Sequence, residues 1–251
     1  MNAYETVLAA RGENRLTAGD YIKRMIPDFF ELHGDRLCGD DSAVIAGIGT
    51  LGKRAVTVIG IEKGKTTEER IRYNFGSAHP EGYRKALRLM KQAEKFRRPV
   101  LCLVDTAGAF CGIDAEEHGQ GRAIAECLLE MADLATPVIS VIIGEGGSGG
   151  ALALSHSDRI WMTEDAYFSV VSPENCANIL WKDTKRAAEA AEALGLTAEQ
   201  LRSMGLIERI CTKDNPKRLA AELEAEFDVL AGLSPKELLE ARYRRFRKIG
   251  C

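Results

Sequence analysis

The residues of this chain best suited to chemistry are the glycines between positions 144 and 150. They are Gly144, Gly146, Gly147, Gly149 and Gly150. They follow a largely β-branched run at 138–143, typical of a buried strand, and lead into a small-residue run at 149–155 that predicts a helix. Glycine permits sharp turns and close approach of another molecule to the backbone. Since the first N–H groups of a helix lack partners inside it, we expect this junction to attract a phosphate or a transient oxyanion.

One interpretation of this run is the nucleophile elbow of α/β-hydrolases. Residues 146–150 match its G-x-S-x-G pattern, with Ser148 as the nucleophile. That fold needs an acid and then a histidine after the serine. The only later histidine is His156, which lies in the same predicted helix with no acid between them. The residues around the serine therefore argue against a hydrolase.

Three other interpretations remain. Residues 144–149 match the G-x-G-x-x-G dinucleotide fingerprint, and Glu164 follows about twenty residues later, but the motif lies past the middle of the chain. Simple packing of a helix on a sheet would account for Gly149 and Gly150, but not for the other three glycines together. The last interpretation is an oxyanion hole, in which backbone N–H groups hold an oxygen that becomes negative.

Alternating strands and helices must position this junction. Strands are predicted at 43–50, 54–61, 100–105, 138–143, 159–163 and 206–211, with a strand and turn at 165–174. Helices are predicted at 17–32, 80–98, 115–134, 149–155, 183–204 with a break at Gly195, 215–230 and 234–249. Residues 1–16 are expected to form a short helix or arm, and 66–79 to be irregular. The pattern favours one α/β domain of stacked βα units over residues 1–251, closed by C-terminal helices at 215–251.

A second glycine-bearing loop, at 106–112, also follows a predicted strand. The carboxyl ends of parallel strands meet at one edge of a sheet, so this loop and the glycine run can face one ligand. Residues 60–66 resemble a Walker A loop that is one residue short, which makes nucleotide binding a weak alternative there. Glu145, Glu116, Glu117 and His118 are acid or base candidates, although the last three fit the solvated first turn of a helix better.

Composition excludes several classes of protein. The chain has 251 residues, 45% of them hydrophobic and 28% charged, with a net charge of -3. These values are ordinary for a soluble globular protein and give no reason to expect nucleic acid or a membrane as partner. The seven cysteines are scattered without a C-x-x-C pair, which predicts a reduced cytoplasmic protein without a metal site.

Several long motifs together resemble one family. They are Glu31–Arg36, Asn74–Gly76, Pro80–Met90, Asp105–Ala109, Ile143–Ala153 and Ser172–Asp183. In order and spacing they are similar to the alpha subunits of bacterial acetyl-coenzyme A carboxylase carboxyltransferases, over roughly residues 17–211. The family usually has a proline where this chain has Ala107 and a tyrosine where it has Phe110. These two differences should leave backbone N–H donors available at the site. A longer N-terminal helical region of the family is largely missing here. Residues 212–216 replace a stretch after the last strand that contains glycine and histidine in the family.

The resemblance implies a crotonase-type ββα superhelix and a defined reaction. A carboxyl group would pass from N-carboxybiotin, held on a separate biotin carboxyl carrier protein, to acetyl-coenzyme A, giving malonyl-coenzyme A for fatty acid biosynthesis. A zinc-bearing beta subunit would bind most of the coenzyme A in an α2β2 assembly. ATP would be used only by a separate biotin carboxylase. No metal is expected in this chain.

The resemblance also suggests which residues act. We expect the N–H groups of Gly146 and Gly147 to hold the ureido oxygen of carboxybiotin as it becomes negative. The residues expected to bind substrate are Gly108, Ala109, Phe110, Gly149 and Gly150. A different crotonase-fold enzyme of acyl-coenzyme A, such as a biotin-dependent decarboxylase or a hydratase, is the alternative, followed by a dinucleotide-binding oxidoreductase.

Overall fold

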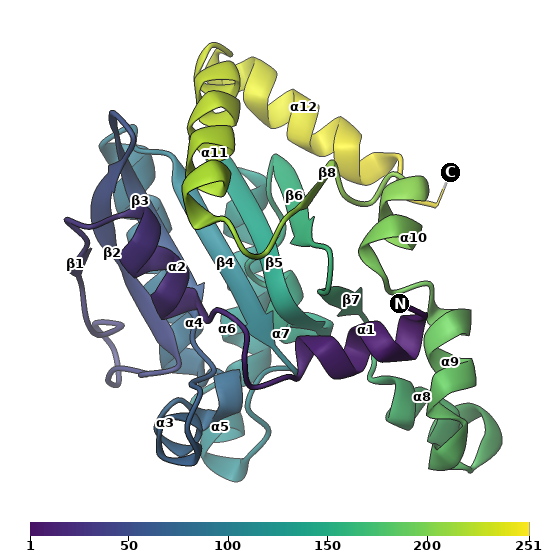
Figure 1. Cartoon of the computed structure of the whole chain (residues 1–251). Helices are drawn as coiled ribbons and strands as arrows, with labels where there is room; N and C mark the ends of the chain where they lie inside the picture. The colour runs from purple at the N-terminus through teal and green to yellow at the C-terminus, as the bar shows by residue number, and fades with distance from the viewer. Residues whose placement is uncertain (251) are drawn as a thin grey trace.

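An eight-stranded mixed sheet forms the centre of the molecule in a computed structural model that describes residues 1–250 (Figure 1). The strands are β1 Phe30–Glu31, β2 Val44–Leu51, β3 Arg54–Ile61, β4 Val100–Thr106, β5 Val138–Gly147, β6 Arg159–Thr163, β7 Tyr167–Ser169 and β8 Arg209–Cys211. Their order is β1-β2-β3-β4-β5-β6-β8, and β7 pairs with the carboxyl end of β5. The first three strands pair antiparallel and the others parallel.

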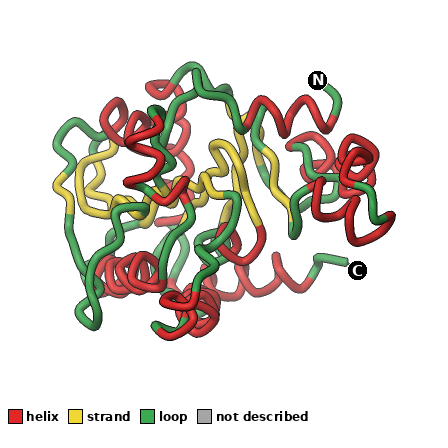
Figure 2. The backbone as a smooth tube through the Cα atoms, turned by 90° about the horizontal axis from the view of Figure 1, so that it is seen from below, coloured by secondary structure: helices red, strands yellow, loops and turns green. Residues whose placement is uncertain are grey.

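Helices cover both faces of this sheet (Figure 2). They are α1 Ala3–Ala10, α2 Ala18–Met25, α3 Thr67–Arg72, α4 Pro80–Lys95, α5 Ile113–Glu117, α6 Gln120–Ala132, α7 Ser148–Leu152, α8 Pro173–Trp181, α9 Ala187–Leu194, α10 Ala198–Ser203, α11 Pro216–Ala231 and α12 Pro235–Arg247. Short 3-10 turns occur at η1 Asn74–Gly76 and η2 Thr184–Arg186. Side chains of α4 and α6 pack on one face, and those of α2 and α11 on the other. The predicted α/β architecture is confirmed.

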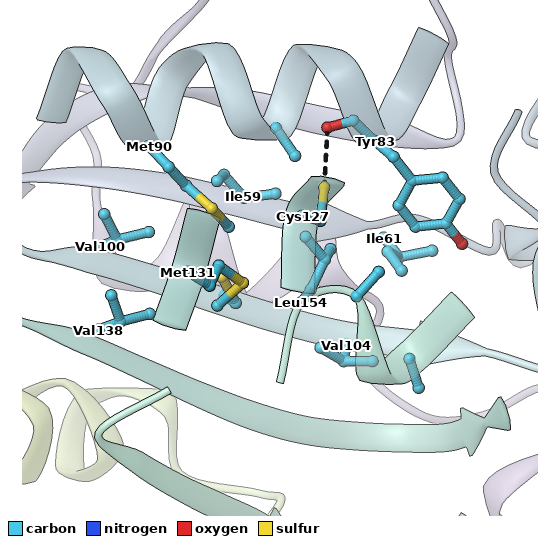
Figure 3. Packing of buried hydrophobic residues seen from close by; sticks show 14 of the residues in the cluster. Ile59, Ile61, Tyr83, Met90, Val100, Val104, Cys127, Met131, Val138 and Leu154 are labelled. Atoms are coloured by element: carbon cyan, nitrogen blue, oxygen red, sulfur yellow. Dashed lines mark hydrogen bonds between the residues drawn. The ribbon is translucent and has the colours of Figure 1, made fainter. Parts of the chain in front are cut away.

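The strands at the centre are buried on both faces. Val100, Cys102 and Val104 of β4 enter the core beneath α4 and α6, whereas Leu101 and Leu103 face α2 and α11. Figure 3 shows the first of these cores, where methionines from the helices meet valines from the strands. Because alternate residues point to opposite faces, such a strand must be apolar throughout, which is why its sequence shows no alternation.

Several boundaries differ from those predicted. The first predicted helix ends at Met25, and its expected continuation instead contains β1. The predicted helix at 115–134 is two helices, α5 and α6, separated by Gly119 with a φ of 80°. Residues 66–79 were expected to be irregular but contain α3. Thr66 and Glu69 cap that helix reciprocally, so its T-x-x-E signal was present in the sequence.

The cysteines form no disulfide among the described residues. The six cysteines among residues 1–250 are free thiols, and Cys251 lies outside the described residues. Over the described part of the chain, no helix combines the length and apolar character needed to cross a bilayer.

A buried arginine attaches the C-terminal helix α12 to the rest of the molecule. Arg242 is 1% exposed and binds both carboxylate oxygens of Asp158, at 2.9 and 2.8 Å. Its remaining N–H groups donate to the carbonyl oxygens of Met131, Leu134 and Thr136, which follow from the end of α6. A fully bonded guanidinium of this kind carries its charge into the interior without leaving a donor unpaired.

We expect Arg242→Met to lower the free energy of unfolding by about 3 kcal/mol or more, because it leaves Asp158 buried and uncompensated. Urea denaturation monitored by circular dichroism measures this change. The matched control is Arg244→Met, whose exposed pair with Glu240 spans one turn of the same helix. It should change the free energy by less than about 1 kcal/mol. Equal effects of the two substitutions would contradict the role given to Arg242.

Candidate active site

Strands β4 and β5 lose their regular register just before the glycine run. Val104 lies opposite Ile142, but two residues later Thr106 lies opposite Gly146. Strand β5 therefore contains extra residues over this stretch, which is the pattern of a β-bulge. Such irregularities change the direction of side chains near the end of a strand, and here they coincide with buried acidic residues on both strands.

Two buried carboxylates occupy this bulge, and three cations neutralise them. Asp105 is 0% exposed and pairs with Arg15. Glu145 is 3% exposed and pairs with Lys63 and, at 2.9 Å, with Arg11. A buried carboxylate without such partners would cost several kcal/mol. We call these five side chains the bulge cluster.

The bulge cluster also satisfies backbone groups that the irregular pairing exposes. The Asp105 carboxylate accepts the N–H of Glu145 at 3.0 Å, and Arg15 donates to the carbonyl oxygen of Ile143 at 3.4 Å. The Tyr167 hydroxyl donates to Glu145 at 2.7 Å. Side chains thus replace the partners that β4 would supply in a regular sheet.

Arg11 extends the bulge cluster to α8. Its guanidinium binds Glu174 through two N–H groups, at 2.7 and 3.2 Å, in addition to its contact with Glu145. This hydrogen bonding holds the pKa of Glu174 below its usual value. The N-terminal arm predicted for residues 1–16 is therefore bound across the end of β5, with helix α1 packed near β7 and α9.

Lys63 is the cation of the bulge cluster whose charge is most sensitive to pH. Its pKa is lowered to about 8, mainly by burial and also by the nearby arginines, against the attraction of Asp105. It lies in the loop that resembles a short Walker A motif. The Glu62 carboxylate accepts hydrogen bonds from the N–H of Gly64 in that loop and from the N–H of Gly19, both at 2.7 Å. A carboxylate of the protein itself therefore binds these two backbone donors.

Two cavities flank the turn from β5 into α7. The first has a volume of about 580 Å³ and a polar wall that includes Arg11, Lys63 and Glu145. The second has a volume of about 330 Å³ and is lined mainly by apolar residues from α7, β7, α9, α10 and the segment after α10. Ser148 and Val170 line both cavities. The glycine turn therefore lies between a charged compartment and an apolar one.

The five glycines of the run are not equivalent. At Gly144, Gly146, Gly147 and Gly150 an added Cβ atom would lie within 3.0 Å of another atom. Close packing therefore explains four of them. Three of the four are Gly144, Gly146 and Gly147, for which packing alone was not expected to account. Gly149 differs, because the nearest atom to its Cβ position would be 3.8 Å away and it lines the apolar cavity.

Gly146 and Gly147 belong to strand β5 and not to the loop that the sequence predicts. Gly146 pairs with both neighbouring strands, β4 and β7, and Gly147 lies opposite Ser169 of β7. The chain leaves the strand at Ser148, whose φ of 53° is in the left-handed region. The following helix α7 begins there and ends at Leu152, shorter than the predicted 149–155.

The second predicted loop, after β4, is largely engaged with the protein itself. The N–H of Gly108 donates to the Thr106 hydroxyl at 3.0 Å. The N–H of Phe110 donates to the carbonyl oxygen of Ala78, also at 3.0 Å, so the expectation that this donor stays available is wrong. The Phe110 ring stacks on His79 with centroids 4.0 Å apart. Ala109 contacts the glycine run through its backbone, which meets Gly150.

Sequence reasoning missed the cations of the bulge cluster. Arg11 and Arg15 lie in a segment whose polar composition predicted only an arm, and their partners are more than 80 positions away. Lys63 was noticed only as part of a phosphate-loop pattern. Glu145, by contrast, was named as an acid or base candidate and does line the polar cavity.

Comparison with known proteins agrees with this architecture. A family model described as acetyl co-enzyme A carboxylase carboxyltransferase-like matches residues 1–250. The acetyl-coenzyme A carboxylase carboxyl transferase subunit alpha of Ruminiclostridium cellulolyticum is 53% identical over 256 residues, covering 100% of this chain and 98% of the relative. That of Streptococcus pneumoniae strain Hungary19A-6 is 51% identical, covering 99% of this chain and 100% of the relative. Both relatives are matched over nearly their whole length.

Solved structures share the fold at low sequence identity. Transcarboxylase 12S with methylmalonyl-coenzyme A and methylmalonic acid bound has a TM-score of 0.73 at 18% identity, covering 89% of this chain and 44% of that one. A Pseudomonas malonate decarboxylase hetero-tetramer in complex with malonate has a TM-score of 0.70 at 19% identity, covering 90% and 86%. The crotonase-type fold implied by the motifs is thus confirmed. From its motifs, fold and relatives, the chain belongs to the family of acetyl-coenzyme A carboxylase carboxyltransferase alpha subunits.

Proposed function

We propose that this chain accepts N-carboxybiotin from a separate carrier protein and releases its carboxyl group for transfer to acetyl-coenzyme A, giving malonyl-coenzyme A for fatty acid biosynthesis. Identity of 51–53% along the whole chain favours this function over that of the decarboxylase, which shares only the fold at 19%. The dinucleotide alternative loses support because Gly144 and Gly146 lie inside β5 and not in a loop before a helix.

The position of the glycine turn between the two cavities carries this proposal. When the carboxyl group leaves biotin, negative charge develops on the ureido oxygen, and fixed N–H donors stabilise it by about 3 kcal/mol each. Since Gly146 is paired on both sides, we place these donors at Gly147 and the residues after it. The apolar cavity beside Gly149 suits the biotin rings, and the polar cavity suits the carboxyl group.

The charge balance of the polar cavity supports the same arrangement. Three cations, Arg11, Arg15 and Lys63, face three carboxylates, Asp105, Glu145 and Glu174, so the group is neutral while Lys63 is protonated. Loss of that proton leaves one excess negative charge. Because the departing carboxyl group and the ureido oxygen are both negative, we expect the neutral state to be the active one.

Partners complete the proposed reaction. Acetyl-coenzyme A and the second oxyanion would be held mostly by a zinc-bearing beta subunit in an α2β2 assembly. A biotin carboxyl carrier protein would bring carboxybiotin, and ATP would be used by a separate biotin carboxylase, all in the cytoplasm. Val170, Ile179 and Leu180 support a partner surface beside the cavities, since their exposed fractions are 77%, 63% and 59%.

Gly149→Ala tests the placement of the turn. We expect the variant to fold normally, because the added methyl group meets no atom closer than 3.8 Å, and to lose roughly 10- to 100-fold in transfer rate through displacement of the biotin ring. The assay is decarboxylation of malonyl-coenzyme A with free biotin as acceptor, using the chain assembled with its beta subunit. Gly121→Ala, at an exposed and open position in α6, is the matched control. A Gly149→Ala enzyme with the full rate would refute the placement.

The pKa of Lys63 predicts a pH dependence. We expect the transfer rate to fall as pH rises through about 8, where Lys63 loses its proton. Lys63→Arg should move this decline to higher pH because arginine stays charged, and Lys63→Gln should lower the rate and flatten the profile. Lys65→Gln, in the same loop but with an exposed side chain paired to Asp20, should leave the profile unchanged. If the decline stays near pH 8 in both Lys63 variants, another group is responsible.

A further inference from the structure

A second group of chemically capable side chains lies in a cavity that shares no lining residue with the two beside the glycine turn. Its volume is about 360 Å³. Cys38, Glu81 and His118 line it, and one ligand atom from each lies within 4.8 Å of the other two. They come from the loop after β1, the first turn of α4 and the end of α5. A thiolate, a carboxylate and an imidazole together form a donor set that suits zinc.

One buried ion pair contacts all three residues, Glu81 through its carboxylate and the other two through their backbone. Arg84 donates to the Glu81 carboxylate at 2.9 Å, to the carbonyl oxygen of His118 at 2.8 Å and to Asp35 at 2.7 Å. Asp35 in turn accepts three successive N–H groups, including that of Cys38 at 2.9 Å. The Asp35 side chain is 0% exposed and that of Arg84 13%. Such supporting contacts typically fix the geometry of metal ligands.

The ligands also have the right charges for a divalent cation. Arg84 is balanced by Asp35, which leaves the Glu81 carboxylate without a full counter-charge of its own. His118 Nδ1 lies 2.7 Å from Glu81 Oε1, a hydrogen bond that zinc binding would replace. Zinc binding would release the thiol proton of Cys38 to solvent, and the thiolate and carboxylate together would then neutralise the ion.

We propose that Cys38, Glu81 and His118 form a zinc site in this chain, separate from the carboxyl-transfer site. Three protein ligands leave a fourth position for water, as in open zinc sites. The ion would join the loop after β1 to α4 and α5, three segments whose separation in the sequence hides the cluster from any search for cysteine spacing. The expectation of a chain without metal depended on such spacing.

Titration of the full-length chain, first stripped of metal with a chelator, tests the site. Cobalt(II) serves as the probe because its bond to a thiolate gives a near-ultraviolet absorption band. We expect one equivalent of cobalt to produce this band and one equivalent of zinc to abolish it. Cys38→Ser should remove the band, whereas Cys111→Ser, at another exposed cysteine outside the cluster, should retain it.

Asp35→Asn separates positioning from ligation. It keeps all three ligands but weakens their support, so we expect zinc affinity to fall about 10- to 100-fold while the cobalt band persists at saturation. Circular dichroism confirms that each variant is folded. Absence of a thiolate band in the wild-type chain, a band that survives Cys38→Ser, or equal zinc affinity of the wild type and the His118→Ala variant would each overturn the proposal.

Discussion

The buried carboxylates of the β4–β5 bulge impose the constraint on which the rest of the site depends. Neither Asp105 nor Glu145 can remain ionised in the interior without cations close by. The protein supplies those cations from the N-terminal segment and from the loop after β3, and so both segments must lie across the carboxyl end of the sheet. The polar cavity is a consequence, since two of these cations, Arg11 and Lys63, form part of its wall together with Glu145.

This constraint also explains why the glycines lie where they do. Gly144 leaves room for Arg15 and Asp105, whose atoms would be 2.5 Å from a Cβ atom there. Gly147 allows the loop after β4 to approach, because its Cβ would lie 2.1 Å from the carbonyl oxygen of Ala107. Gly149 has no such neighbour, which makes it the glycine of the run best suited to touch a ligand. One run of residues thus combines four closely packed glycines with one that is open.

The sequence predicted the elements well and their long-range contacts poorly. Uninterrupted apolar runs identified β4 and β5, and Gly195 marked the end of α9, because these signals are local. The contact between Arg11 and Glu145 joins positions 134 apart, and the chain between them contains no pattern that pairs the two. The bulge was hidden for a similar reason, since register depends on side chains from both strands. The family motifs pointed to the glycine run, but only the packing of the folded chain shows which of its glycines is open.

The proposed function depends on one contact, in which the turn after β5 holds the ureido oxygen of biotin between an apolar and a charged cavity. A crystal structure of the chain with its beta subunit and biocytin tests this most directly. We expect the biotin rings in the cavity beside Gly149, with the ureido oxygen within hydrogen-bond distance of an N–H group between Gly147 and Gly150. Biocytin bound at another face, with those N–H groups bonded to the protein's own carbonyl oxygens, would contradict it.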